Sequence, residues 1–195
     1  TTMFDDFSEV YALHPDIDST ALMIYVSTWV LTKITKNSMD KRKHVPEVVE
    51  GLIEYLIPFL FRGIDFLTSR DVDNDGILEQ DYNEDWMDTI LRDGKVVYSQ
   101  ACWLMALTSF ANLLFVREKE DDAQRLQYIA SQLVDSIENK MWYEMGRCYI
   151  DIKSDKLAGD DQRGILCQDI VFYVFAMTEL LPQIGPNNSK VNQHH

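Results

Sequence analysis

The pattern of apolar and polar positions predicts a chain made mainly of helices. Apolar residues recur every three or four positions between about residues 18 and 36, which predicts a first helix. A second is expected over about 46–70, opened by Pro46 and kinked or split by Pro58, since proline removes one hydrogen bond of the helix. The stretch 97–116 is apolar nearly all round, which is typical of a buried helix.

Two further helices complete the expected architecture. Residues 121–142 are apolar on one side only, whereas 165–181 are apolar throughout. The polar stretch 143–163 between them is expected to hold a short hairpin around the sequence CYIDIK. Buried and half-exposed helices thus alternate, which predicts an all-α fold of α/α-hairpins packed side by side. We expect one domain over 1–195, with a flexible tail over 183–195.

Composition and charge narrow the classes of partner. The 195 residues carry 32 acids against 18 bases, a formal net charge of -14. Nucleic acids and anionic membrane surfaces are therefore poor partners, whereas neutral sugars, cations and basic proteins remain open. There is no run of 18 apolar residues, so we expect no membrane span. The three cysteines have no metal-binding spacing, so we expect no metal or cofactor, and their odd number favours a reducing, cytoplasmic compartment.

The stretch from Arg70 to Asp88 breaks the helical pattern. Eight of these 19 residues are Asp or Glu, so we expect a loop with at most a short helical turn. Asp85 and Asp88 lie three residues apart in the sequence DWMD and would share a face if the turn is helical. Neighbouring carboxylates raise each other's pKa, so one of them can stay protonated and donate a proton to a leaving group. A solvated acidic loop is the other interpretation.

Three motifs in this region, DVDNDGILEQ, NEDWMDT and GKVVYSQACWLMAL, resemble amylo-α-1,6-glucosidase-type glycoside hydrolases. The resemblance extends to DIDSTALMIY and to the helix order through about Leu181. It implies part of an (α/α)₆ toroid that acts on an oligosaccharide or α-glucan by inversion. Asp88 matches the family's general acid. Asp85 could instead be the acid, or a ligand of a sugar hydroxyl.

The same resemblance suggests the residues that contact sugar. Glu84, Asp85 and Trp86 surround the expected acid, while Asp18 and Gln100 would line the pocket from the starts of inner helices. From the residues alone, Asp18 is equally explained as an N-cap of its helix, and the same holds for Asp169. Trp103 and Cys102 lie in the apolar stretch, so we expect them to pack in the core.

An inverting glycosidase also needs a second carboxylate, about 6.5–9.5 Å from the first, to activate water. No segment matches the family's general base, and nothing places Glu179 near Asp88. Five helices cannot close a toroid of six hairpins. We therefore expect roughly half a barrel, inactive alone, whose uncovered apolar faces require a homo-oligomer or a complementing half-barrel.

The alternative is a non-catalytic acidic module that binds a basic protein partner or calcium. The stretch Asp71–Gly76 matches the first half of a calcium loop, but Tyr82 stands where an EF-hand needs a bidentate Glu. A looser calcium site would use the carboxylates Asp71, Asp73, Asp75 and Glu79. Arg92 and Lys95 are expected to pair with these acids at the surface, where ion pairs contribute little energy.

Overall fold

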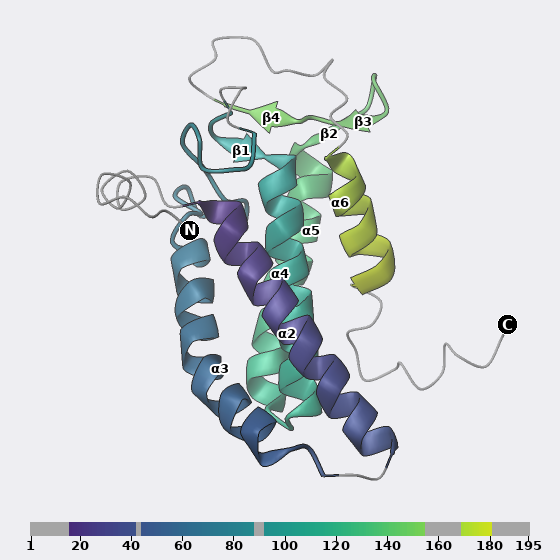
Figure 1. The fold of residues 1–195 in the computed structure, drawn as a ribbon. Helices are drawn as coiled ribbons and strands as arrows, with labels where there is room; N and C mark the ends of the chain where they lie inside the picture. The colour runs from purple at the N-terminus through teal and green to yellow at the C-terminus, as the bar shows by residue number, and fades with distance from the viewer. Residues whose placement is uncertain (1–15, 42–43, 88–91, 155–168, 181–195) are drawn as a thin grey trace, which may run out of the picture.

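The computed structural model describes residues 16–41, 44–87, 92–154 and 169–180, and this part of the chain is mostly helical (Figure 1). The helices are α2 (Ile17–Asp40), α3 (Glu47–Thr68), α4 (Val97–Val116), α5 (Glu120–Lys140) and α6 (Ile170–Phe175), and α6 continues as the π-helix η1 (Ala176–Leu180). The strands are β1 (Lys95–Val96), β2 (Trp142–Tyr143), β3 (Cys148–Tyr149) and β4 (Ile152–Lys153). The helical class that the sequence pattern predicts is therefore confirmed.

Helix α4 is the centre of the bundle, with α2, α5 and α6 packed around it (Figure 1). Of its 20 residues, 17 are buried, because it is apolar on every side. Trp103 and Cys102 are fully enclosed, which confirms their predicted place in the core. By length and composition, α4 is the one helix in the described ranges that could cross a membrane. However, 83% of its apolar stretch is buried inside the protein, as expected of a core helix.

Helix α2 lies against α4 along a stripe of residues spaced by three and four. Ile17, Ala21, Ile24 and Leu31 are buried, and Thr28 donates a 2.8 Å hydrogen bond across the interface to Ser109 Oγ. The helix begins earlier and ends later than the pattern predicts. Its first turn therefore includes position 18, so the N-capping interpretation of that residue is wrong.

Helix α3 continues through Pro58, so of the two predicted alternatives, a kinked or a split helix, the split is wrong. Pro58 lies on the solvent-exposed side, while Ile57 and Leu60 beside it are buried against the rest of the bundle. Proline removes one backbone hydrogen bond, but the packing of the apolar side holds the helix together. Figure 1 shows α3 curving along its length rather than breaking.

The short strands lie together at one end of the bundle, above the N-terminal ends of α4 and α6 (Figure 1). Strand β1 pairs with β4, opposing Val96 to Ile152, and β2 pairs with β3 as a hairpin. The expected hairpin around CYIDIK is therefore only partly correct. Its CY half pairs with the preceding WY, and its IK half reaches back to the start of α4. This end of the bundle also carries the acidic loop.

Candidate functional site

A hollow of about 420 Å³ opens at the strand-bearing end of the bundle. It is lined by Trp86 from the acidic loop, Tyr98 from α4, and Asp169, Val171 and Phe172 from the start of α6. These residues come from three separate parts of the sequence, which the packing of α6 on α4 brings together. The acidic loop therefore borders a concave surface, rather than standing alone in solvent.

Three aromatic rings form the wall of this hollow. The Tyr98 ring lies edge-on to Trp86, at 6.4 Å between centroids, and edge-on to Phe172, at 5.5 Å. Trp86 is 49% exposed, a large fraction for a tryptophan, so one part of its ring is free to contact a ligand. Its indole Nε1 donates a 3.3 Å hydrogen bond to Asp169 Oδ2, which fixes the direction of the ring. Apolar ring faces beside a carboxylate are the surroundings in which a sugar ring can pack and hydrogen-bond.

Behind the rings lies a buried cluster of charges centred on Arg92, whose side chain is only 1% exposed. Its guanidinium Nη2 lies 2.9 Å from Asp85 Oδ2, and its Nη1 lies 3.1 Å from Asp169 Oδ2 and 3.7 Å from Asp151 Oδ1. One cation therefore faces three carboxylates. Burial raises the pKa of Asp151, Arg92 opposes this, and the other two carboxylates add to it. The expectation that Arg92 forms a surface ion pair is wrong.

Asp18 joins the same region from the first turn of α2. Its Oδ2 accepts a 3.0 Å hydrogen bond from the backbone N–H of Trp86, and the side chain is almost fully buried. Burial raises the pKa of Asp18; hydrogen bonds from Ser19 and Tyr98 oppose the shift, while the charge of Asp85 adds to it. Asp18 thus anchors the loop beside the hollow.

The loop is held in place by a network of buried polar groups. Gln80 Nε2 donates a 2.8 Å hydrogen bond to Asp85 Oδ2, and the Ser99 hydroxyl donates to Gln80 Oε1. Gln80 and Gly94 also exchange backbone hydrogen bonds. The backbone N–H of Met87 donates to Asp85 Oδ1 at 2.9 Å, so both oxygens of that carboxylate have partners. The loop is therefore a fixed structure up to the residue before Asp88.

The sequence-predicted site residues fall into three groups. Asp18, Asp85 and Trp86 lie together around or beside the hollow. The expected acid, Asp88, lies outside the described residues, and it follows the described loop directly in the sequence. Glu84 and Gln100 do not line the hollow, and their contact with sugar stays a prediction.

Glu84 and Gln100 hold the loop instead. Glu84 Oε2 lies 2.5 Å from Arg70 Nη2 and accepts a hydrogen bond from the backbone of Asp81. The Gln100 amide is fully buried, accepting from the backbone N–H of Leu78 at 2.9 Å and donating to the Leu78 and Val96 carbonyls. Neither residue lines the hollow.

Four residues of the site are missing from the sequence-based expectations: Tyr98, Asp151, Val171 and Phe172. All four lie in apolar or short mixed segments where core packing is the default interpretation. Asp169, in contrast, can be noticed in the sequence, because it is an acid directly before an apolar helix. The structure gives it no capping hydrogen bond and joins it instead to Trp86 and Arg92.

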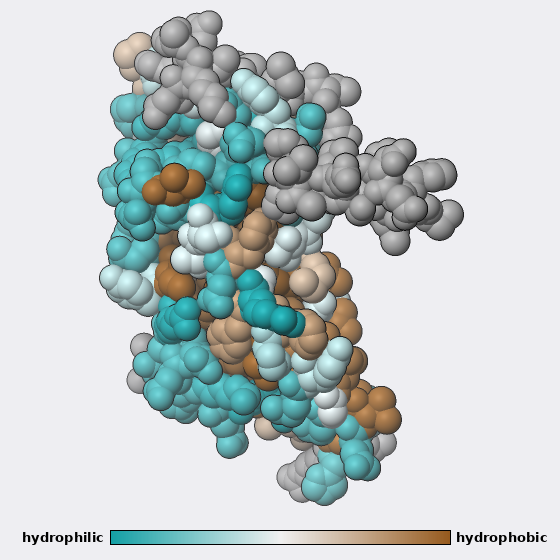
Figure 2. Space-filling model, turned by 90° about the vertical axis from the view of Figure 1, so that its left-hand side faces the viewer, coloured by the Kyte–Doolittle hydropathy of each residue, from teal (hydrophilic) through white to brown (hydrophobic). Residues whose placement is uncertain are grey.

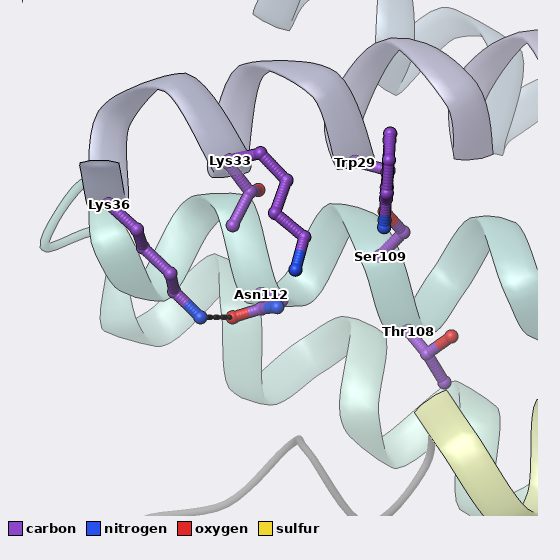
Figure 3. A pocket seen from close by; sticks show the side chains of 7 residues that line it. Trp29, Lys33, Lys36, Thr108, Ser109 and Asn112 are labelled. Atoms are coloured by element: carbon purple, nitrogen blue, oxygen red, sulfur yellow. Dashed lines mark hydrogen bonds between the residues drawn. The ribbon is translucent and has the colours of Figure 1, made fainter. Parts of the chain in front are cut away.

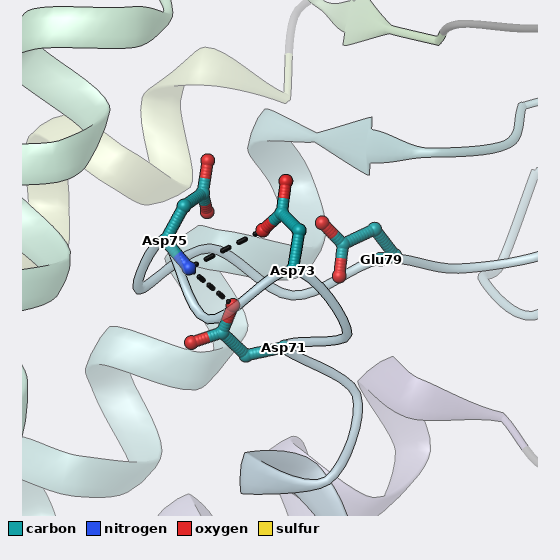
Figure 4. A group of neighbouring side chains, drawn as sticks. All are labelled: Asp71, Asp73, Asp75 and Glu79. Carbon is teal, nitrogen blue, oxygen red and sulfur yellow. Dashed lines mark hydrogen bonds between the residues drawn. The ribbon is translucent and has the colours of Figure 1, made fainter.

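A second group of carboxylates lies on the outer side of the loop (Figure 4). Asp71, Asp73, Asp75 and Glu79 each place an oxygen within 4.8 Å of the others, as the looser calcium-site hypothesis requires. Two lysines pair with these carboxylates, however. Lys95 Nζ lies 2.6, 2.5 and 3.1 Å from the carboxylates of positions 73, 75 and 79, and Lys140 Nζ lies 2.8 Å from that of position 75. The ammonium groups therefore occupy the place between the acids.

Comparison with known proteins adds no relative, since no family model, curated protein or solved structure matches the chain. The resemblance to amylo-α-1,6-glucosidase-type enzymes therefore depends on the quoted motifs alone.

Proposed function

We propose that this chain forms a glycoside hydrolase-type domain whose hollow binds one sugar ring of an oligosaccharide or α-glucan. The observation that carries this proposal is the hollow itself, where three aromatic rings adjoin a buried group of carboxylates. Aromatic rings pack against the C–H faces of a pyranose, and the carboxylates accept hydrogen bonds from its hydroxyls. Asp169 lines the hollow and is the first candidate for such a contact.

In the proposed reaction, Asp88 is the general acid that protonates the glycosidic oxygen. It follows Met87, the last residue of a loop segment that Asp85, Gln80 and Asp18 hold in place. A fixed loop suits this role because a general acid must stay within hydrogen-bond reach of one oxygen atom. Inversion further requires a carboxylate on the opposite side of the sugar, about 6.5–9.5 Å away, to activate water. The sequence motifs do not identify that base.

We further propose that the helices form an arc of an (α/α)₆ toroid and that a complementing half-barrel or a second copy covers the exposed apolar faces. On α3, Val48, Leu52, Tyr55 and Phe59 recur at spacings of three and four, and all are exposed. Figure 2 views the molecule from the side of α3 and shows apolar side chains in the centre and along the right-hand edge of this face. An uncovered apolar stripe of this regularity supports contact with another helix.

Sugar binding is tested by tryptophan fluorescence during titration with maltose and isomaltose. We expect a saturable change that Trp86→Phe removes, because Trp86 is the tryptophan that lines the hollow. Trp142→Phe is the matched control: Trp142 is also partly exposed, but it lies in β2 and its Nε1 bonds to Glu144. Absence of any response to either sugar would overturn the proposal.

Catalysis is tested with Asp88→Asn in any assembly of the chain that hydrolyses isomaltose. Loss of the acid should lower kcat by about 10²–10⁴-fold while sugar affinity stays unchanged. Asp81→Asn, in the same loop, serves as the control for general changes in loop charge. Full turnover by Asp88→Asn would exclude this residue as the acid.

A further inference from the structure

A second hollow lies between the C-terminal half of α2 and α4 (Figure 3). Trp29, Thr32, Lys33 and Lys36 line it from α2, and Asn112 lines it from α4 together with two small hydroxyl residues. Its volume is about 40 Å³. A single water needs roughly 10–15 Å³ of such space, so the hollow has room for about three waters or one small polyatomic group.

Positive charge gathers here in a chain whose net charge is -14. Figure 3 shows the ammonium groups of Lys33 and Lys36 both directed toward Asn112, and Lys36 Nζ donates to Asn112 Oδ1 at 3.2 Å. Lys33 Nζ also lies 5.7 Å from the centroid of the Trp29 ring. Among the described residues, no carboxylate lines the hollow. Two like charges are therefore held together without an acid between them.

The surroundings of Lys36 also disfavour its charged form. Burial lowers the pKa of Lys36, the charge of Lys33 lowers it further, and Asp40 partly opposes the shift. The charge of a negative ligand between the ammonium groups would oppose this shift.

The polar groups that remain available are donors. The Asn112 oxygen accepts from Lys36, so its NH₂ group is the part left to donate to a ligand. Thr32 is 4% exposed, and its hydroxyl has no hydrogen-bond partner in the described part of the chain. A buried hydroxyl without a partner is uncommon, and here it belongs to a residue that lines the hollow. The hydroxyl of Ser109, in contrast, already bonds to the Tyr25 carbonyl.

We propose that this hollow binds a small oxyanion of the phosphate or carboxylate type. The two ammonium groups supply charge-assisted hydrogen bonds, and the Asn112 amide and the Thr32 hydroxyl donate to further oxygens. Such a ligand accepts at every oxygen, which matches a hollow that offers donors. The site is separate from the aromatic hollow near Asp169 and does not depend on the function proposed for it.

The proposal is tested by calorimetric titration of the intact chain with inorganic phosphate, and separately with acetate, at constant ionic strength in chloride. We expect saturable binding of phosphate that the double variant Lys33→Gln/Lys36→Gln weakens by at least about 10-fold. Thr32→Val preserves the shape of the side chain and removes the hydroxyl, so it should weaken binding by roughly 3-fold without unfolding the chain.

Lys41→Gln is the matched control, since Lys41 ends the same helix but does not line the hollow. It should change phosphate affinity by less than about 2-fold. Displacement of phosphate by glycerol 3-phosphate would support a site open to phosphate esters, and failure of the ester to compete would support a site for the free ion. Absence of saturable phosphate binding to the intact chain would overturn the proposal, as would an equal loss of affinity in Lys41→Gln.

Discussion

The acidic loop and its neighbours contribute carboxylates to two clusters, one near solvent and one buried. In the outer cluster, Lys95 is 11% exposed and pairs with three acids whose side chains are 19%, 21% and 57% exposed. In the inner cluster, Arg92 and Asp85 are 1% and 2% exposed. The residue types are nearly the same, but water screens the first set of charges and is excluded from the second. Burial, more than the number of ion pairs, therefore determines what each cation contributes.

The largest expected effect comes from removing the buried cation. Arg92→Met leaves three carboxylates buried without their partner, so we expect a loss of about 3–5 kcal/mol in the free energy of unfolding, measured by urea denaturation. Lys95→Met is the matched control in the outer cluster, where the loss should be about 1 kcal/mol or less. Equal losses in the two variants would contradict the distinction between the clusters.

The next largest effect is expected from a substitution in the backbone between the two clusters. Gly94 lies between Asp93 and Lys95 at a φ of +75°, and a Cβ at this position would stand 2.5 Å from the Lys153 carbonyl oxygen. Gly94→Ala should therefore destabilise the chain by about 1–3 kcal/mol, because both the conformation and the space favour glycine. Gly51→Ala is the control, since nothing lies within 4 Å of its added Cβ. An unchanged denaturation midpoint in Gly94→Ala would show that the turn is free to rearrange.

Asp151 of the inner cluster and Asp75 of the outer cluster should also respond oppositely to pH. Asp151 has a raised pKa, so the folded chain keeps its proton at pH values where the unfolded chain has released it. Its contribution to stability therefore falls as the pH rises from the unfolded pKa of 3.8 through the raised folded pKa. Burial would also raise the pKa of Asp75, but Lys140 and Lys95 lower it overall, so its contribution is lost as the pH falls below 3.8.

Urea denaturation at a series of pH values checks this difference. Asp151→Asn should lose less stability than the intact chain as the pH rises above 3.8, while Asp75→Asn should lose less as the pH falls below it. Parallel pH profiles for the intact chain and Asp151→Asn would contradict the raised pKa.

The smallest effect concerns calcium at the outer cluster. Lys95 and Lys140 occupy the carboxylate oxygens that a cation would need, so millimolar calcium should leave the melting temperature of the intact chain unchanged. Lys95→Gln/Lys140→Gln frees these oxygens and should gain a few degrees on addition of calcium. Magnesium is the control, since it loses its water reluctantly and should have less effect. Calcium stabilisation of the intact chain would favour the non-catalytic alternative.

The sequence predicts well what depends on local pattern. The bounds of α4 match the apolar stretch 97–116, because a helix buried on every side has apolar residues throughout. The buried place of Arg92 is not predictable in this way. Its partner Asp169 lies 77 positions along the chain, and only the packing of α6 against α4 brings the two together.

The residues around the hollow are likewise predictable only in part. Trp86 and Asp85 stand out as unusual within an acidic loop, but Tyr98 and Phe172 look like ordinary core residues of apolar helices. Gln100 is the opposite case. A polar residue near the start of an inner helix suggests a ligand contact, yet the Gln100 amide forms hydrogen bonds with the backbone of the loop.

The central position of α4 also sets a length scale for the molecule. Tyr98 borders the aromatic hollow and Asn112 borders the lysine-lined one, and the same helix carries both. At a rise of about 1.5 Å per residue, roughly 21 Å of helix separates them. Because neighbours enclose this rod along its whole length, the two hollows keep a constant separation, and no molecule much shorter than that span can touch both at once.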